Sequence, residues 1–130
     1  MAKLSVGEVM TRRVVYLPEG TMLDEAAQAM RDQGIGDVVV TSGPTMVGVV
    51  TDRDIVTRAI AADLPPKQTT LGTITSRELI MVEQSATVEE AVQAMRERGV
   101  RRLLVCDADR KVVGIISLSD VALFPTSAPA

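Results

Sequence analysis

The chain carries one pattern twice, and this internal repeat is the feature that most limits what it can fold into. Residues 23–31 (LDEAAQAMR) match residues 88–96 (VEEAVQAMR) at a shift of 65 positions. One extra residue in the second copy, within residues 107–110, raises the shift to 66, which pairs Gly48 with Gly114. A repeat of about 60 residues that spans nearly the whole chain predicts two similar structural units.

Within each copy the pattern predicts the order strand, helix, strand, strand, helix. In the first copy Leu23, Ala26, Ala27 and Met30 recur at helical spacing, which indicates a helix with one buried stripe. Gly34 suits the C-terminus of that helix. Runs rich in Val, Ile and Leu predict the strands. The expected strands are residues 14–17, 38–40 and 47–51, and their counterparts are residues 79–82, 103–105 and 112–116.

The first helix of the second copy has the same signals. Its apolar stripe consists of Val88, Ala91, Val92 and Met95. Thr87 and Glu90 have the spacing of a capping box, and Gly99 follows the stripe. Met30 and Met95 are therefore expected in the core. The acidic residues of the first turns are expected to interact with the helix dipoles: Asp24, Glu25, Glu89 and Glu90.

A second helix is expected to begin near Arg53 in the first copy and near Ser119 in the second. We expect the repeats at residues 4–62 and 71–124, a linker with two prolines at 63–70, and a disordered tail at 125–130. The small sheet of one copy would leave an apolar face uncovered. The two copies should therefore pack about a pseudo-two-fold axis into one mixed α/β (α+β) body.

Composition excludes several classes of function. The net charge of −3 and the aromatic content of 2% disfavour a nucleic-acid-binding protein. The chain has no histidine, which removes the commonest general base and a common metal ligand. The single cysteine, Cys106, lies in an apolar run and is expected to be buried. No apolar run suggests a signal peptide or a membrane span, so a cytoplasmic location is expected.

Each copy places a hydroxyl and then a carboxylate where a strand passes into a helix. Thr51 and Asp54 follow Gly48, and Ser117 and Asp120 follow Gly114 at the same spacing. Free backbone N–H groups at a helix start favour anions. A carboxylate there can accept two hydrogen bonds from a vicinal diol such as ribose. The pattern predicts a nucleotide site that is present twice.

The repeat and its two motifs resemble a pair of CBS domains, often called a Bateman module. The similarity covers residues 4–124, including the opening residues 6–11 and the run 51–55. It leads us to expect a stand-alone pair with no attached catalytic domain. The resemblance implies a sensor that binds an adenosine-containing ligand, AMP, ADP, ATP or S-adenosylmethionine, and signals to a partner in trans. It also implies a homodimer, and no cofactor or metal.

The resemblance further implies which residues line the two sites. Asp54 and Asp120 would hold ribose hydroxyls, and Thr51 and Ser117 would support ribose or phosphate. The family geometry exchanges parts between copies. The site of Asp54 would add Arg53, Arg101, Arg102, Val100 and residues 76–79, which include Leu79. The site of Asp120 would add Ser119, Ile35, Gly36 and residues 10–14, which include Val14.

This assignment gives the site of Asp54 several cations, so a phosphorylated nucleotide should bind there more tightly. Simpler roles stay open for the same residues. The two aspartates and the two hydroxyl residues can be plain helix caps. Arg101 and Arg102 can be solvated charges, and only one of two neighbours on a strand faces a given side.

Two other functions remain alternatives. An enzyme is disfavoured because we find no pairing of nucleophile and base, no phosphate-binding Gly-Lys-Thr loop and no cluster of metal-binding carboxylates. A ligand-free interaction scaffold with the same fold is the second alternative. Binding of an adenosine compound would distinguish the sensor from the scaffold.

Overall fold

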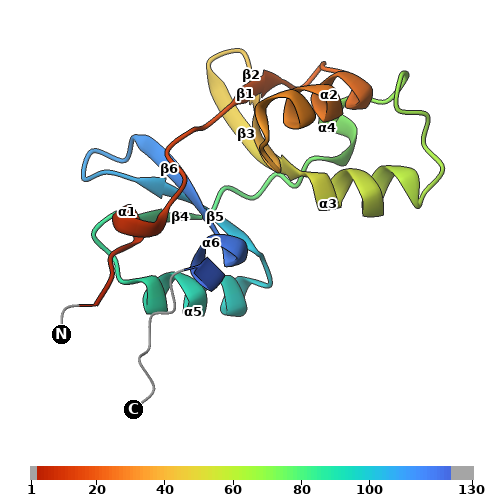
Figure 1. The fold of residues 1–130 in the computed structure, drawn as a ribbon. Coiled ribbons are helices and arrows are strands. Elements are labelled where there is room, and N and C mark those ends of the chain that lie inside the picture. The colour runs from red at the N-terminus through yellow and green to blue at the C-terminus, as the bar shows by residue number, and fades with distance from the viewer. Residues whose placement is uncertain (1–2, 124–130) are drawn as a thin grey trace. The chain divides into compact units, whose positions relative to one another are not determined.

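The computed structural model describes residues 3–123 and divides the chain into two compact units (Figure 1). Unit 1 comprises Met1–Val14 and Ile80–Ala130, and unit 2 comprises Val15–Leu79. Each unit contains one three-stranded sheet with accompanying helices. The predicted mixed α/β fold with two copies of one arrangement is confirmed. The tail predicted at residues 125–130 lies outside the described residues.

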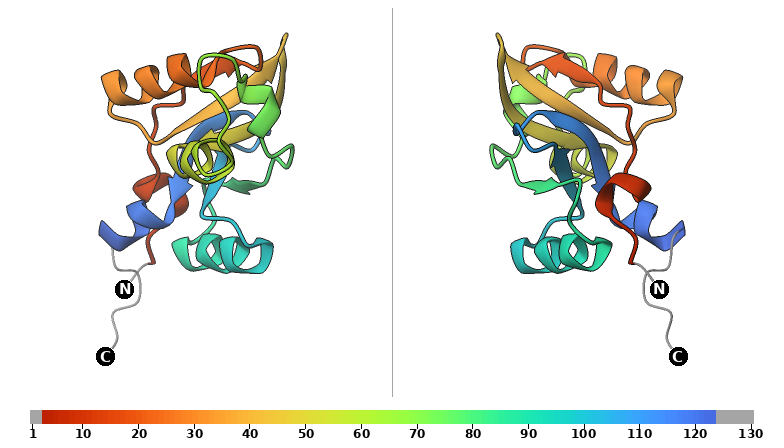
Figure 2. Two further views of the ribbon diagram at one scale, coloured as in Figure 1. Left: turned by 90° about the vertical axis from the view of Figure 1, so that its right-hand side faces the viewer. Right: turned by 90° about the vertical axis from the view of Figure 1, so that its left-hand side faces the viewer.

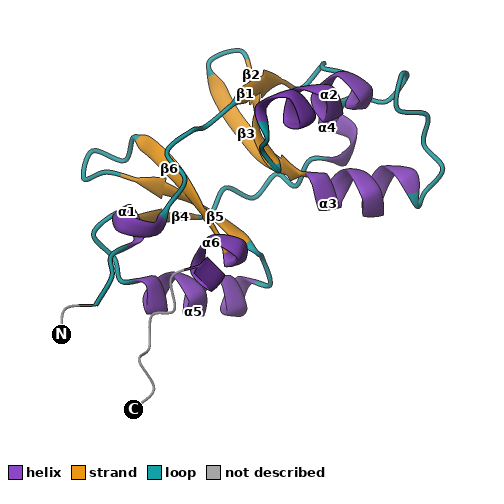
Figure 3. Ribbon diagram, in the orientation of Figure 1, coloured by secondary structure: helices purple, strands orange, loops and turns teal. Residues whose placement is uncertain are grey.

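Unit 2 is built on the sheet β1-β2-β3, whose strands are Tyr16–Pro18, Asp37–Ser42 and Thr45–Thr51. The strands β1 and β2 run parallel because the helix α2 (Leu23–Gln33) connects them, whereas β2 and β3 form an antiparallel hairpin. The short helix α3 (Asp52–Asp54) follows β3 and continues into the π-helix η1 (Ile55–Ile60). Figure 3 shows these helices beside the strands.

Unit 1 repeats this order. Its sheet β4-β5-β6 consists of Met81–Glu83, Arg102–Cys106 and Val112–Ser117. The helix α5 (Val88–Arg98) connects the parallel strands β4 and β5, and α6 (Leu118–Leu123) follows β6. Cys106 is buried, as predicted. The strands predicted from apolar runs are all present, with ends shifted by one or two residues.

The helix ends follow the predicted signals. Thr87 and Glu90 form the expected capping box, in which the Thr87 N–H donates to Glu90 Oε1 at 2.9 Å and the Glu90 N–H donates to Thr87 Oγ1 at 3.1 Å. The Thr87 N–H and the Thr87 hydroxyl both donate to the Glu90 carboxylate, and these two bonds lower the pKa of Glu90. Gly34 and Gly99 end α2 and α5 with φ of 65°, a left-handed conformation that favours glycine.

Each unit has its own apolar core, and Met30 and Met95 lie in these cores as predicted. Leu23, Ala26 and Met30 of the predicted α2 stripe are buried in unit 2, but Ala27 is exposed, so the buried stripe is narrower than predicted. Val88, Ala91 and Met95 of the α5 stripe are buried in unit 1, and Val92 packs against the same core. The unit 2 core contains Leu23, Ala26, Met30, Val38, Val40, Val50, Ile55, Ala59, Leu71 and Ile74. The unit 1 core contains Val6, Val9, Met10, Val88, Ala91, Met95, Leu103, Val105 and Ile116.

The opening segment of each repeat belongs to the unit that holds the body of the other repeat. The short helices α1 (Val6–Val9) and α4 (Leu71–Ile74), which were not predicted, contribute apolar side chains to the cores of unit 1 and unit 2. Backbone hydrogen bonds hold them: the Val6 N–H donates to Ala86 O at 2.8 Å, and the Leu71 N–H donates to Thr21 O at 2.9 Å. Figure 2 shows α1 beside the ribbons of β6 and α6 in both views.

The opening segments come closest to the sheets at the two motif glycines. A Cβ atom on Gly48 would clash with the Ser76 carbonyl oxygen and lie 2.6 Å from Thr75 Oγ1. A Cβ atom on Gly114 would lie 2.7 Å from the Thr11 carbonyl oxygen. Glycine is needed at both positions because a neighbouring backbone occupies the space of a side chain.

We predict that Gly48→Ala lowers the free energy of unfolding by about 1–3 kcal/mol, because the added methyl group must push the backbone at Ser76 away from β3. Chemical denaturation measures the change. Gly20→Ala is the matched control, since a Cβ atom there meets nothing within 4 Å. Equal stability of the two variants would contradict the close approach.

Candidate functional site

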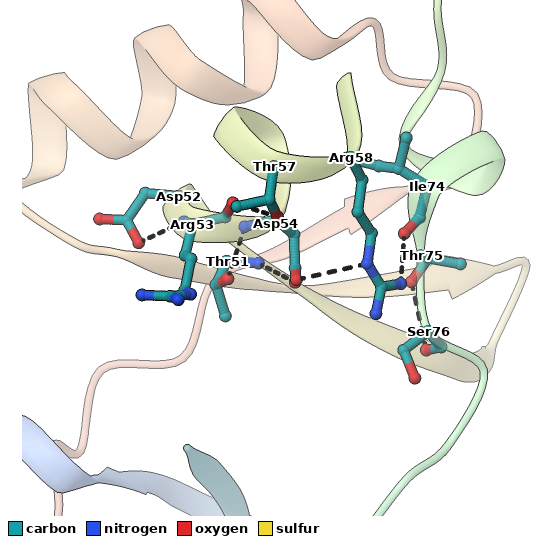
Figure 4. Close-up of polar contacts among 9 residues, drawn as sticks. All are labelled: Thr51, Asp52, Arg53, Asp54, Thr57, Arg58, Ile74, Thr75 and Ser76. Atoms are coloured by element: carbon teal, nitrogen blue, oxygen red, sulfur yellow. Dashed lines mark hydrogen bonds and ion pairs between the residues drawn. The ribbon is translucent and has the colours of Figure 1, made fainter. Parts of the chain in front are cut away.

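In unit 2 the strand β3 passes into the helix α3 through a reciprocal pair of hydrogen bonds (Figure 4). The Thr51 N–H donates to Asp54 Oδ2 at 2.9 Å, and the Asp54 N–H donates to Thr51 Oγ1 at 3.0 Å. This is a capping box in which an aspartate replaces the usual glutamate. The sequence motif therefore has a structural role before any ligand is considered.

Unit 1 has the same arrangement where β6 meets α6. The Ser117 N–H donates to Asp120 Oδ2 at 3.0 Å, and the Asp120 N–H donates to Ser117 Oγ at 3.2 Å. The capping role that was left open for both motifs is thus observed. A carboxylate has about four acceptor positions, so one capping bond leaves each aspartate able to accept further hydrogen bonds.

The opening segments lie beside both capping boxes. In unit 2 Ser76 pairs with Val49 of β3, the strand that leads into the helix of Asp54. In unit 1 Thr11 pairs with Ile115 of β6, and its hydroxyl donates to Asp120 Oδ1 at 3.4 Å. The stretches expected near each aspartate, residues 76–79 and 10–14, are therefore in the same unit as that aspartate.

Arg58 is a residue that the sequence analysis missed. Its Nε lies 3.7 Å from Asp54 Oδ1, and its Nη1 donates to the Ile74 carbonyl oxygen at 3.2 Å. Figure 4 shows the side chain between the aspartate and the opening segment. The spacing of four residues from Asp54 on a helix was the available signal. The repeat did not support this signal, because the second copy has Phe124 at the position equivalent to Arg58.

The start of α3 carries two more charged residues. Asp52 Oδ1 accepts a hydrogen bond from the Arg53 N–H at 2.8 Å. The side chain of Arg53 is exposed and extends in a different direction from that of Asp54 (Figure 4). The Asp52 N–H donates to the carbonyl oxygen of Gly36 at 2.9 Å. Gly36, a predicted site residue, therefore lies beside the start of α3 in its own unit.

Unit 1 has a surface hollow of about 270 Å³ at the start of α6. Its lining consists of Arg101, Arg102, Ser117, Leu118, Ser119 and Ala122. Both arginines contribute because Arg101 precedes the strand β5 and so escapes the alternation of strand side chains. Two guanidinium groups and two hydroxyls give this hollow a lining suited to an anion.

The remaining predicted residues are placed as follows. Ile35 packs on the core of unit 2 and Val100 packs on the core of unit 1. Val14 and Leu79 are half-buried and stand where the chain leaves unit 1 and unit 2, respectively. The expected approach of Ile35 and Gly36 to Asp120, and of Val100, Arg101 and Arg102 to Asp54, stays a prediction.

In the part of the chain from residue 3 to residue 123, no group of three or more Cys, Asp or Glu side chains is arranged to hold a metal ion. Over the same residues, no helix has the length and apolar character needed to cross a bilayer.

Comparison with known proteins places the two repeats in one family. Residues 6–60 and 71–125 each match the family model of the CBS domain. A relative from Methanopyrus kandleri of uncharacterised function is 34% identical over 122 residues, which cover 93% of this chain and 62% of that protein. The chain thus spans less than two thirds of the length of this relative.

Two further relatives have informative names. Hypoxic response protein 1 of Mycobacterium tuberculosis is 33% identical over 88% of this chain and 80% of its own length. A solved CBS domain protein of Pyrobaculum aerophilum, complexed with AMP, is 27% identical with a TM-score of 0.80. The match covers 94% of this chain and 93% of that structure.

We predict that Thr51→Ala lowers the free energy of unfolding by about 1 kcal/mol, because the Asp54 N–H loses its hydroxyl acceptor. Chemical denaturation without ligand measures this change. Thr57→Ala is the control: the Thr57 hydroxyl donates to Arg53 O at 2.8 Å inside a helix, and losing it should cost less than about 0.5 kcal/mol. A larger loss in the control would show that Thr51 is not the important cap.

Proposed function

The chain belongs to the CBS-domain family and carries two CBS domains, the arrangement called a Bateman module, and from this premise we propose that it senses adenine nucleotides. The ligand would be AMP, ADP, ATP or S-adenosylmethionine, and occupancy would be passed to a partner protein in trans. A cytoplasmic location, expected from the sequence, is part of this proposal. So is the absence of catalysis.

The observation that carries the proposal is the duplicated aspartate at a capped helix start. In the capping boxes Asp54 and Asp120 each accept one hydrogen bond through Oδ2, and both keep acceptor positions for a ribose diol. The AMP complex of the relative from Pyrobaculum aerophilum supports an adenosine ligand. The hydroxyls of Thr51 and Ser117 accept one hydrogen bond each and can still donate one to ribose or phosphate.

Cations near both motifs support a phosphorylated ligand. Arg58 lies beside Asp54, and Arg101 and Arg102 line the hollow at Ser117. We propose that the site of Asp54 binds the nucleotide more tightly, with Arg53 and Arg58 of unit 2 contributing to it. Guanidinium groups bind phosphate through two parallel hydrogen bonds, which favours a nucleotide over a nucleoside.

We predict that calorimetric titration of the protein with the four adenosine compounds detects binding by at least one of them. Asp54→Ala should weaken the tighter site by about 10- to 100-fold, because hydrogen bonds to a charged acceptor contribute about 1.5–3 kcal/mol each. Native mass spectrometry before titration establishes that no ligand was carried through purification.

Asp120→Ala is the matched control for the assignment of the tighter site. Intact affinity in Asp54→Ala together with lost binding in Asp120→Ala would reverse the assignment. If the ligand-free, folded wild-type protein bound none of the four compounds, this result would contradict the sensor hypothesis and favour the interaction scaffold. Steady hydrolysis of ATP that is lost in Asp54→Ala would contradict the non-catalytic role.

We also propose that the protein forms a homodimer through its helices. Val56 and Ile60 lie one helical turn apart on η1 and are 58% and 55% exposed, which leaves an apolar strip on the surface of unit 2. A second copy of the chain is the occupant expected for such a strip in a CBS pair. The helix α6 lacks an equivalent strip, because Ala122 stands at the position that corresponds to Val56.

We predict that a double variant, Val56→Glu with Ile60→Glu, is monomeric where the wild-type protein is dimeric, because two charges would have to be buried in the interface. Sedimentation velocity measures the mass. Changing two exposed charged residues of α2, Arg31→Glu with Asp32→Lys, serves as the control and should leave the dimer intact. A dimer that survives the η1 changes would place the interface elsewhere.

A further inference from the structure

Arg58 connects two parts of unit 2 that are distant in the chain. Its Nε forms an ion pair with Asp54 Oδ1 at 3.7 Å, and its Nη1 donates to Ile74 O at 3.2 Å. The Asp54 side chain is 22% exposed and that of Arg58 is 50% exposed, so the pair is only partly screened by solvent. One guanidinium group therefore joins the proposed ribose carboxylate to the opening segment that carries α4.

The contacts of Asp54 leave it suited to a diol. Oδ2 accepts from the Thr51 N–H and Oδ1 faces Arg58, so each oxygen has one interaction within unit 2. Each oxygen then keeps about one further acceptor position. Two positions on two oxygens of one fixed carboxylate match the two hydroxyls of a vicinal diol. Without Arg58, only the bond to Oδ2 would orient the carboxylate.

In unit 1 two contacts also orient the aspartate, but they come from different groups. Asp120 Oδ2 accepts from the Ser117 N–H, and Asp120 Oδ1 accepts from the hydroxyl of Thr11 in the opening segment. The second contact of the aspartate reaches the opening segment in both units. In unit 1 the link is one neutral hydroxyl, and in unit 2 it is a charged side chain that spans two contacts.

We propose that Arg58 is a positioning residue for the ribose carboxylate of unit 2 and couples ligand binding at Asp54 to the opening segment at residues 74–79. This inference rests on the proposed nucleotide function. A diol that binds Asp54 changes the strength of the ion pair between Asp54 and Arg58. This change reaches the Ile74 carbonyl through the same guanidinium group. The backbone of this segment pairs with β3 at Val49, and Asp54 lies on α3, which directly follows β3.

The test compares Arg58→Gln and Arg58→Lys with Arg31→Gln, which removes an arginine from an exposed helical ion pair in the same unit. All three are made with Asp120→Ala, so that Asp54 is the remaining ribose carboxylate. Titrations with AMP and 2′-deoxy-AMP give the preference for an intact diol. Arg58→Gln should lower this preference by about two- to fivefold, the range of a partly exposed ion pair. Arg31→Gln should leave it unchanged.

Arg58→Lys separates orientation from charge. A lysine keeps the charge but lacks the planar fork that reaches two acceptors, so it should not restore the preference for the diol. Full restoration by lysine, or an unchanged preference in Arg58→Gln, would overturn the proposal while AMP binding by the wild-type protein still supports the nucleotide function. Absence of binding of AMP, ADP, ATP and S-adenosylmethionine alike to the wild-type protein would overturn both.

Hydrogen exchange provides a second readout, which does not need Asp120→Ala. In the otherwise unchanged chain, Arg58→Gln should raise the exchange rate of backbone amides in residues 74–79, whereas Arg31→Gln should not. In the wild-type protein AMP should alter exchange in this segment, and Arg58→Gln should abolish that response. Identical exchange in wild type and Arg58→Gln, with and without AMP, would overturn the coupling.

Discussion

The arrangement of each unit depends on the close contact between a strand glycine and the backbone of an opening segment. At Gly48 the neighbour is the chain at Thr75 and Ser76, and at Gly114 it is the chain at Met10 and Thr11. Because no side chain stands between them, the segment can pair with the edge of the strand. This pairing brings α4 into the core of unit 2 and α1 into the core of unit 1. It also brings a polar segment to each aspartate.

The same atoms serve folding and the proposed function. Asp54 and Asp120 satisfy a strand-end N–H that would otherwise lack a partner at the start of a helix. A carboxylate held for this purpose is already oriented, so a ligand that binds it loses little side-chain entropy. Capping and diol binding are therefore compatible roles, because the cap uses only part of the capacity of the carboxylate.

Much of this was predictable from the sequence where local signals are strong. Thr87, Glu90, Gly34 and Gly99 have roles set by neighbouring backbone groups, and each acts as its type suggests. The helices α1 and α4 were missed because four residues give no periodicity, and their stability comes from contacts far away in the chain. The spacing of Arg58 from Asp54 is a local signal, but its contact with Ile74 O could not be predicted locally, because this partner lies 16 residues away.

The exchange of opening segments has a consequence for how such a chain could arise. A single repeat contains the opening of one unit and the body of the other, so it cannot complete either core from its own residues. Two separate copies can do so by trading openings, as in a domain-swapped dimer. Joining them in one polypeptide replaces a bimolecular encounter with an intramolecular one at a high effective concentration. Once joined, the copies are free to diverge, and the pairing of Asp54 with an arginine and of Asp120 with a threonine is such a divergence.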